Sequence, residues 1–118
     1  DNDSNDISLD STSGSITVNG QVNAGSLGDV ALDASGNITG QQVIADNLDI
    51  DAGGLIDLGT TIATLTASSG TATTINETDA IELTDVQSTD GAIEVIAGGN
   101  ISALNVESLT NNDANNIP

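Results

Sequence analysis

The chain has 118 residues and carries 18 Asp and Glu but no Lys, Arg or His, which gives a formal charge of −18. It also has no Cys, Met, Phe, Trp or Tyr. Without His, Cys or Lys, the usual general bases and nucleophiles are missing, so we expect no enzyme. Nucleic acid is not an expected partner, because its binding relies on Lys and Arg. Membrane insertion is not expected either, because no apolar run approaches roughly 18 residues.

Aliphatic residues alternate with polar ones along most of the chain. In chain order, the clearest alternating pairs are Ile7-x-Leu9, Ile16-x-Val18, Val30-x-Leu32, Leu48-x-Ile50, Ile81-x-Leu83 and Ile93-x-Val95. This period of two, interrupted by Gly, Asn, Asp and Ser, predicts short strands joined by tight turns. No window shows a sustained period of 3.6, so we expect little or no helix.

A short motif recurs, in which two alternating apolar residues are followed by a small residue, a Gly and another apolar residue. Copies begin at Ile7, Val30, Leu48, Ala63 and Ile93. The small residue and the Gly predict a sharp bend, because Gly reaches positive φ without a steric clash. The apolar residue after the bend then starts a strand on a new face.

Stacked copies of this motif predict an all-β fold, a right-handed parallel β-helix (β-solenoid) of about five to six coils. No coil can bury its own apolar face alone, so neighbouring coils must cover it. From their common place in the motif, we expect one inward column to contain Leu9, Leu32, Ile50, Leu65 and Val95.

A longer repeat relates the two ends of the sequence. Residues 1–7 resemble residues 111–117, at an offset of 110 residues. We therefore expect residues 1–118 to form a single β-solenoid segment, about one 110-residue period of a longer or head-to-tail array. The ends of such a segment expose unpaired strands, which predicts self-association with further copies, end to end or laterally.

The segment from Ile93, Ile-Glu-Val-Ile-Ala-Gly-Gly-Asn-Ile-Ser-Ala-Leu-Asn-Val, resembles the repeats of large bacterial surface adhesins of the filamentous-haemagglutinin-like type. The segment from Ile75 to Val86 is similar to repeats in giant secreted proteins of planctomycete-type bacteria. The resemblance implies secretion, an extracellular or cell-surface location, and a structural role in a filament, stalk or giant adhesin. It implies no catalytic residue.

A cluster of acids makes calcium the one metal to consider. Asp46, Asp49 and Asp51 fall within six residues, and Asp49 and Asp51 should share the outward face of a strand. Calcium takes six to eight oxygen ligands, several of them carboxylates. An acidic module that binds Ca²⁺ and so rigidifies or bundles fibres is therefore the alternative function. The competing interpretation is a solvated acidic face that keeps a fibre soluble.

Two further hypotheses concern sugars. Paired carboxylates are also found in carbohydrate-active β-helix enzymes, which makes such an enzyme a distant alternative. Separately, Asn and Ser or Thr side chains could carry glycans, and acceptor triplets begin at Asn2, Asn37, Asn76 and Asn100. Asn37 and Asn100 follow motif glycines, so a stacked Asn ladder at the turn is the competing interpretation for those two.

Overall fold

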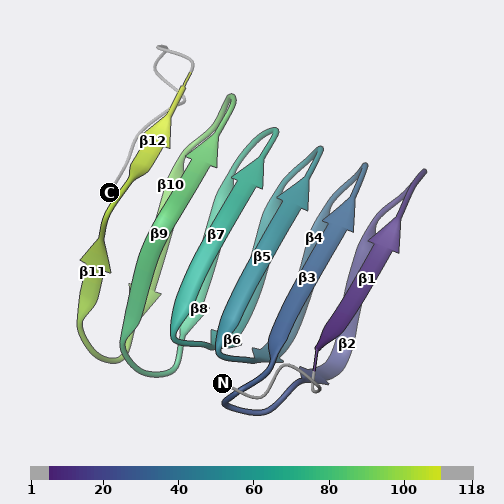
Figure 1. Ribbon diagram of the computed structural model, residues 1–118. Helices are drawn as coiled ribbons and strands as arrows, with labels where there is room; N and C mark the ends of the chain where they lie inside the picture. Colours follow the sequence, from purple (N-terminus) through teal and green to yellow (C-terminus); the bar gives the residue numbers. More distant parts are fainter. Residues whose placement is uncertain (1–5, 110–118) are drawn as a thin grey trace.

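The computed structural model describes residues 6–109, which form strands and turns and contain no helix (Figure 1). The strands divide into two sheets. The first sheet contains β1 (Ile7–Ser11), β3 (Asp29–Ala34), β5 (Asn47–Ala52), β7 (Thr64–Ser69), β9 (Ile81–Ser88), β11 (Ile101–Ala103) and β12 (Val106–Ser108). The second sheet contains β2 (Ile16–Asn23), β4 (Ile38–Ile44), β6 (Ile56–Thr61), β8 (Thr73–Glu77) and β10 (Ile93–Ala97).

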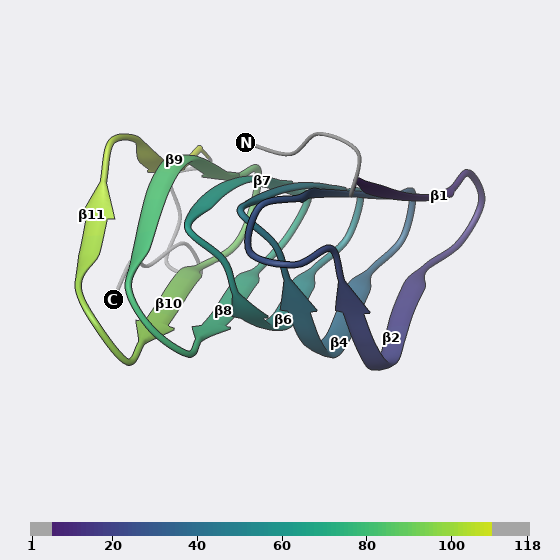
Figure 2. The ribbon, with the colours of Figure 1, turned by 60° about the horizontal axis from the view of Figure 1, so that its bottom comes forward.

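The chain alternates between the two sheets, and each strand pairs in parallel with the strand one coil earlier. Figure 2 shows the two sheets facing each other across the core. The predicted all-β parallel solenoid is therefore confirmed, with about five turns. Its right-handed winding remains a prediction.

Alternation within each strand builds the core between the sheets. In β5, Leu48, Ile50 and Ala52 are buried, while Asp49 and Asp51 point outward and are exposed. Successive side chains of a strand point to opposite faces, so every second residue reaches the core. Because aliphatic residues occupy those positions in most coils, stacking buries a continuous apolar interior.

One predicted inward column is correct for its first three members, Leu9, Leu32 and Ile50, which pair in sequence across β1, β3 and β5. The fourth member is wrong. Leu65 pairs with Leu48, and Ala67 takes the place beside Ile50. The motif suggested a step of 15 residues here, whereas the strands pair at a step of 17, so the register moves by two residues. Both registers keep the same face inward, since the side-chain period is two.

The fifth member of the predicted column, Val95, lies in the other sheet. It is on β10, where it pairs with Ile75 of β8. The column beside Ala67 continues instead through Val86 of β9, after a one-residue irregularity that follows Leu65. Both sheets have one buried face and a bend at the strand end, so the same motif serves strands of either sheet.

Motif glycines stack at one corner of the solenoid, but not for the predicted reason. The amides of Gly36, Gly54 and Gly70 each donate to the carbonyl of the glycine one coil earlier, at 2.9–3.0 Å. Among the described residues, positive φ occurs only at Gly25. A Cβ on Gly70 would instead overlap the Gly53 carbonyl. These glycines therefore permit close stacking of backbones rather than a left-handed bend.

Candidate functional site

A column of carboxylates follows the outer face of the first sheet. Asp10, Asp33 and Asp51 are exposed and occupy paired positions on β1, β3 and β5. Paired strands lie about 4.8 Å apart, so neighbouring carboxylates in this column are close. The sequence offers no cation to place between them. We call these three residues the acidic column.

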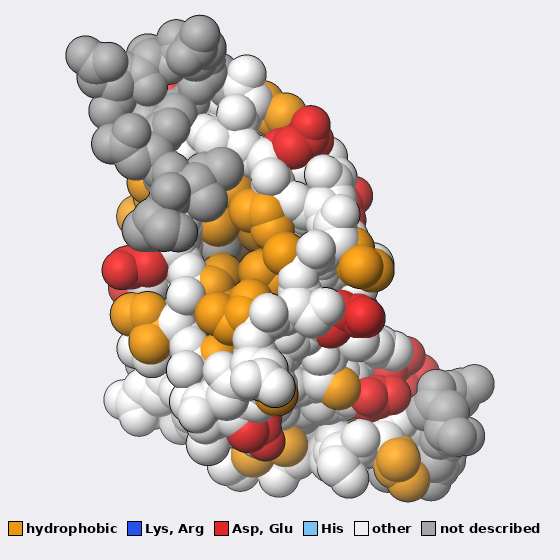
Figure 3. Space-filling view, turned by 90° about the vertical axis from the view of Figure 1, so that its left-hand side faces the viewer, with side chains coloured by type: hydrophobic (Ala, Val, Ile, Leu, Met, Phe, Trp, Pro, Cys, Tyr) orange, Lys and Arg blue, Asp and Glu red, His pale blue; other side chains and the backbone are white. Residues whose placement is uncertain are grey.

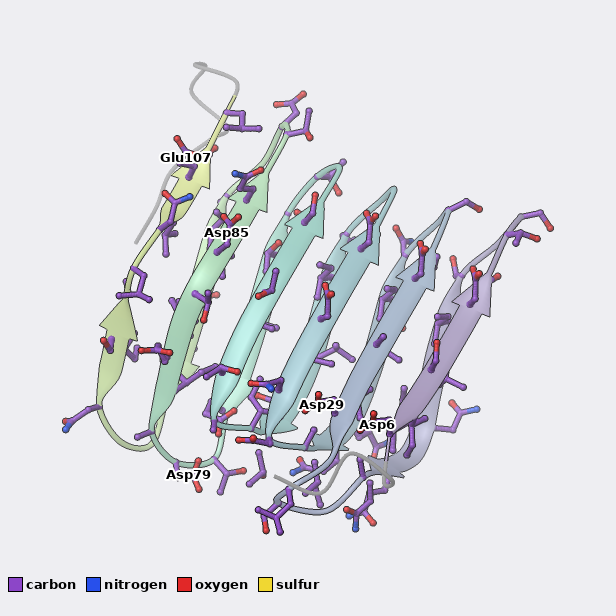
Figure 4. All side chains as sticks on the ribbon, in the orientation of Figure 1. Asp6, Asp29, Asp79, Asp85 and Glu107 are labelled. Atoms are coloured by element: carbon purple, nitrogen blue, oxygen red, sulfur yellow. The ribbon has the colours of Figure 1, made fainter. Side chains whose placement is uncertain are left out.

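Beyond Asp51, the next paired positions on the outer face of the first sheet hold two neutral residues and then another acid. Ser68 and Gln87 follow Asp51, and Glu107 pairs with Gln87. The Gln87 amide donates to Glu107 Oε1 at 3.3 Å. In the same sheet, the side-chain amide of Asn105, just before β12, donates to Oδ1 of Asp85 on β9 at 3.1 Å. Neutral donors thus accompany the two acids labelled on β9 and β12 in Figure 4.

The predicted calcium ligands are divided between a turn and a strand. Asp46 precedes β5 and is half-buried, with its amide donating to the Gly28 carbonyl at 2.7 Å. Asp49 and Asp51 lie on the exposed face of β5, as predicted. Within residues 6–109, no three His, Cys, Asp or Glu side chains are grouped so that they could hold a metal ion. Calcium binding by these residues stays a prediction.

Two grooves lie over the first sheet, and acids line both. The smaller groove, of about 280 Å³, is lined by Ser8, Asp10, Ala31, Leu32, Asp33, Asp49 and Asp51. The larger, of about 480 Å³, has Asp6 and Asp29 among its lining residues. There the backbone amide of Asp29 donates to Asp6 Oδ1 at 3.0 Å. The side-chain amide of Asn47 donates to Asp29 Oδ1 at 3.1 Å. The chain itself therefore engages the carboxylates of Asp6 and Asp29, which Figure 4 places near each other.

The glycan acceptor triplets have mixed surroundings. Asn37 Oδ1 accepts a hydrogen bond from the Leu55 amide at 2.9 Å, which supports a structural use of this side chain at the turn. Asn76 and Asn100 are exposed. Asn2, like the repeat that relates residues 1–7 to 111–117, falls on residues outside the described range.

Within residues 6–109, no strand pairs beyond β1 and β2 at one end of the solenoid, or beyond β10, β11 and β12 at the other. At one end, Ile7, Leu9 and Ile16 pack against the core but are only partly buried. At the other, the first sheet extends one layer beyond the second, through β11 and β12, so that β10 borders an open edge. Figure 3 views this end and shows hydrophobic side chains gathered at its centre, with acidic side chains around them. Leu104, at 66% exposure, and Ile101, at 47%, belong to this end.

One carboxyl group is buried in the core, and it was not predicted from the sequence. Glu77, the last residue of β8, is 4% exposed and points into the core. The Thr60 hydroxyl donates to Glu77 Oε1 at 2.5 Å, and the Ile62 amide donates to both carboxylate oxygens at 3.2 and 3.0 Å. The signal was present in the sequence, because alternation from Thr73 through Ile75 places residue 77 on the inward face.

Burial raises the pKa of Glu77 from 4.5 to about 7. A hydrogen bond with the Asp79 side chain and the charge of Asp79 act in the same direction, while the bonds from Thr60 and Ile62 oppose them. Glu77 therefore holds its proton at pH values where an ordinary carboxyl group is ionised.

Comparison with known proteins identifies no relative. No family model matches this sequence, and no match was found among curated proteins or solved structures. The described residues contain no helix that is long and apolar enough to cross a membrane. The class of protein that the fold defines is a parallel β-solenoid.

Proposed function

We propose that this protein is a structural segment of an extracellular bacterial filament, stalk or giant adhesin. The observation that carries the proposal is the change in burial along one column of the core. Leu32 and Ile50, in the middle of the column, are each 1% exposed, whereas Leu9 and Val106, at its two ends, are only partly buried. A further coil at either end would cover the terminal side chains as the inner coils cover theirs.

The partner that fits these ends is another solenoid coil, and further copies of this chain would supply it. The strands at the two ends of the first sheet, β1 and β11–β12, run parallel to every strand between them. A copy placed along the axis would present a like-oriented edge, and such head-to-tail contacts build open filaments. Lateral association through the outer faces is the second arrangement we consider.

Two features favour this structural role over carbohydrate chemistry. The carboxyl group with the most altered proton affinity, Glu77, faces the core and is 4% exposed, so a sugar could not approach it. In the larger groove over the first sheet, the carboxylates of Asp6 and Asp29 already accept hydrogen bonds from the chain itself.

A second candidate function is calcium-dependent stiffening or bundling of the fibre, and the acidic column favours it. Asp10, Asp33 and Asp51 occupy paired positions on adjacent strands, and the sequence has no Lys, Arg or His side chain to neutralise them. A divalent cation held between coils would relieve their repulsion. Asp49 borders the same groove and, with Asp46 and Asp51, remains the predicted ligand set.

The proposed location is the cell surface or the extracellular matrix, where glycans on exposed Asn, Ser or Thr would add to the solvated face. An acidic surface keeps a long assembly soluble, because copies of the fibre repel one another. An antibody raised against the chain should label intact cells of the source organism. Labelling only after permeabilisation would contradict the extracellular part of the proposal.

Self-association is tested on the purified 118-residue chain. We expect sedimentation velocity to show that the assemblies become larger as the protein concentration rises. Electron microscopy should show unbranched filaments one solenoid wide. Amorphous aggregates alone, without filaments, would contradict stacking through the ends. A thermally stable monomer at all concentrations would overturn the proposal.

A further inference from the structure

The sequence contains a single Asn-Gly pair, Asn19–Gly20, and it lies in β2. β2 is the outermost described strand of the second sheet, so β4 covers one of its edges and no strand within residues 6–109 pairs with the other. The side of the pair that faces away from the core is open as well, because both residues are exposed. Solvent therefore reaches this pair at the N-terminal end of the solenoid.

The backbone of the pair forms a β-bulge. The register between β2 and β4 shifts between Val18 and Gln21. Within this interval two residues of β2, Asn19 and Gly20, stand opposite one residue of β4, Gln41. A bulge leaves the extra residue unpaired and disrupts the ladder locally. The pair is therefore held less firmly than the residues on either side of it.

Neighbouring atoms leave room around Gly20. A Cβ placed on Gly20 would meet nothing within 4 Å, whereas a Cβ on Gly40, in the paired strand, would overlap the Val18 side chain. Glycine also adopts a wider range of backbone conformations than any other residue. Because it has no side chain, its nitrogen approaches the side chain of a preceding Asn with the least steric hindrance.

We propose that Asn19 is a site of spontaneous deamidation in the folded chain. The backbone nitrogen of Gly20 attacks Cγ of Asn19, and the new N–C bond closes a cyclic imide. The side-chain nitrogen of Asn19 leaves as ammonia and takes the proton that the Gly20 nitrogen loses. Water then opens the imide at either carbonyl, which gives Asp or isoaspartate. Water is the one co-reactant, and no other residue of the chain takes part.

Other asparagines are engaged by the fold or followed by larger residues. Asn37 Oδ1 accepts a hydrogen bond from the Leu55 amide at 2.9 Å, and the residue after Asn37 is the β-branched Ile38. The Asn47 side-chain amide donates to Asp29 Oδ1 at 3.1 Å. Deamidation should therefore be selective for the Asn-Gly pair in β2.

The product would alter the edge that a further coil has to cover, and this consequence rests on the proposed filament. Either product replaces a neutral amide with a carboxylate, in a chain whose formal charge is already −18. Isoaspartate also lengthens the backbone of β2, so the residues before and after position 19 no longer keep one register with a neighbouring strand. Deamidation should therefore weaken stacking through the N-terminal end as the protein ages.

Peptide mapping by mass spectrometry tests the reaction on the folded, purified chain during incubation at mildly alkaline pH. The peptide that contains Asn19 should gain the mass difference between an amide and an acid, and should take up one heavy oxygen from labelled water. We expect the rate to lie within about tenfold of the rate in the urea-unfolded chain, because sheet edges open at low free-energy cost. A folded chain that converts much more slowly than this would overturn the proposal, and so would equal conversion at other asparagines.

Two glycine variants test the route through the imide. Gly20→Ala should slow the conversion severalfold, because a methyl group next to the attacking nitrogen hinders ring closure, and the site has room for it. Gly14→Ala is the matched control in the same coil, where the added Cβ would make only an ordinary contact with Ser11 Oγ at 3.6 Å. An unchanged rate in Gly20→Ala would mean that the reaction does not pass through the imide.

Sedimentation velocity tests the effect on stacking separately. Fresh wild type should form larger assemblies than fully converted wild type. Asn19→Gln has a longer side chain that cyclises far more slowly, so incubation should not reduce its assembly. Equal assembly by fresh and converted chains would overturn the effect on stacking. If fresh chains do not assemble at all, the filament is wrong, and the mass measurement alone decides whether Asn19 deamidates.

Discussion

Asp33 and Asp51 occupy paired positions on adjacent parallel strands, β3 and β5, and both side chains are exposed on the outer face of the first sheet. Two unit charges at such a spacing repel by about 1 kcal/mol in water. At physiological ionic strength this repulsion is screened beyond roughly 8 Å, so only neighbours in the column interact strongly. The solenoid thus places like charges together wherever the same acid recurs in successive coils.

The stability of the chain should therefore increase with salt. We expect urea midpoints to rise with NaCl, and to rise further with millimolar CaCl₂ at matched ionic strength if calcium binds between coils. Asp33→Asn should reduce the dependence on salt. Asp57→Asn is the control, because Asp57 is exposed but pairs with Thr39 and Thr74 rather than with another acid.

The outcomes of the salt experiment separate screening from binding. Superimposed midpoints in NaCl, CaCl₂ and chelator at equal ionic strength would exclude calcium binding and leave screening alone. An absence of any salt effect would mean that the acidic column costs no stability. An equal response in Asp33→Asn and Asp57→Asn would show that net charge matters and the column does not.

Gly70 and Gly20 should respond in opposite ways to substitution by Ala. A Cβ on Gly70 would overlap the Gly53 carbonyl, which belongs to the backbone of the preceding coil and cannot move aside easily. We expect Gly70→Ala to lower the free energy of unfolding by about 1–3 kcal/mol. A Cβ on Gly20 would meet nothing within 4 Å, so Gly20→Ala should be neutral or stabilising by up to about 1 kcal/mol. Equal urea midpoints for the two variants would contradict the close-stacking role.

Leu104→Lys should weaken self-association through the C-terminal end. Leu104 is 66% exposed and lies between β11 and β12, the last described strands of the first sheet. A Lys at a sheet edge discourages pairing with another strand. Leu27→Lys is the control, because Leu27 is 53% exposed on the turn between β2 and β3. Sedimentation velocity should show a smaller assembly for Leu104→Lys only. Loss of assembly in both variants would point to added charge rather than to the end of the solenoid.

Thr60→Val should raise the pKa of Glu77 above its wild-type value. The Thr60 hydroxyl hydrogen-bonds to the carboxylate and lowers the pKa of Glu77, so its removal favours the protonated form. An NMR titration of Glu77 measures the shift. Thr66→Val, on the exposed face of β7, is the matched control and should leave the midpoint where it is. An unchanged midpoint in Thr60→Val would mean that this hydrogen bond does not influence the titration.

Much of the fold could be predicted from local pattern, because the pattern records burial directly. Leu48 and Ile50 alternate with Asp49 and Asp51, and a strand with one buried face requires that order. The pairing of Asp33 with Asp51 was also predictable, because their two motif copies have the same length. Where spacing was regular, the sequence alone was enough to align neighbouring coils.

The errors arose where spacing was irregular. Leu65 was placed beside Ile50, although it pairs with Leu48, and Val95 was placed in the first sheet, although it lies in the second. Strands of both sheets have an inward apolar face and end at a corner, so the motif does not indicate which sheet a copy belongs to. Corner lengths determine that, and they vary between coils.

The chemistry of the interior was the least predictable part. Glu77 lies in a stretch rich in Thr, Asn and Asp, where an acid would ordinarily be assigned to the surface. Its burial depends on the Thr60 hydroxyl and the Ile62 amide, which the preceding coil brings within hydrogen-bonding distance. Sequence separation concealed these partners, because Thr60 precedes Glu77 by 17 residues.

The sequence by itself determined that the chain is an acidic all-β solenoid without Lys, Arg or His side chains. Composition and the alternation of apolar and polar residues can be read at each position without knowing which strands pair. Only the tertiary structure decided which coils pair, why the stacked glycines are needed, and which carboxyl group keeps a proton. Those features depend on distances between backbones and side chains one coil apart. Such distances follow from the lengths of the corners and from the packing of the two sheets, and no single motif contains that information.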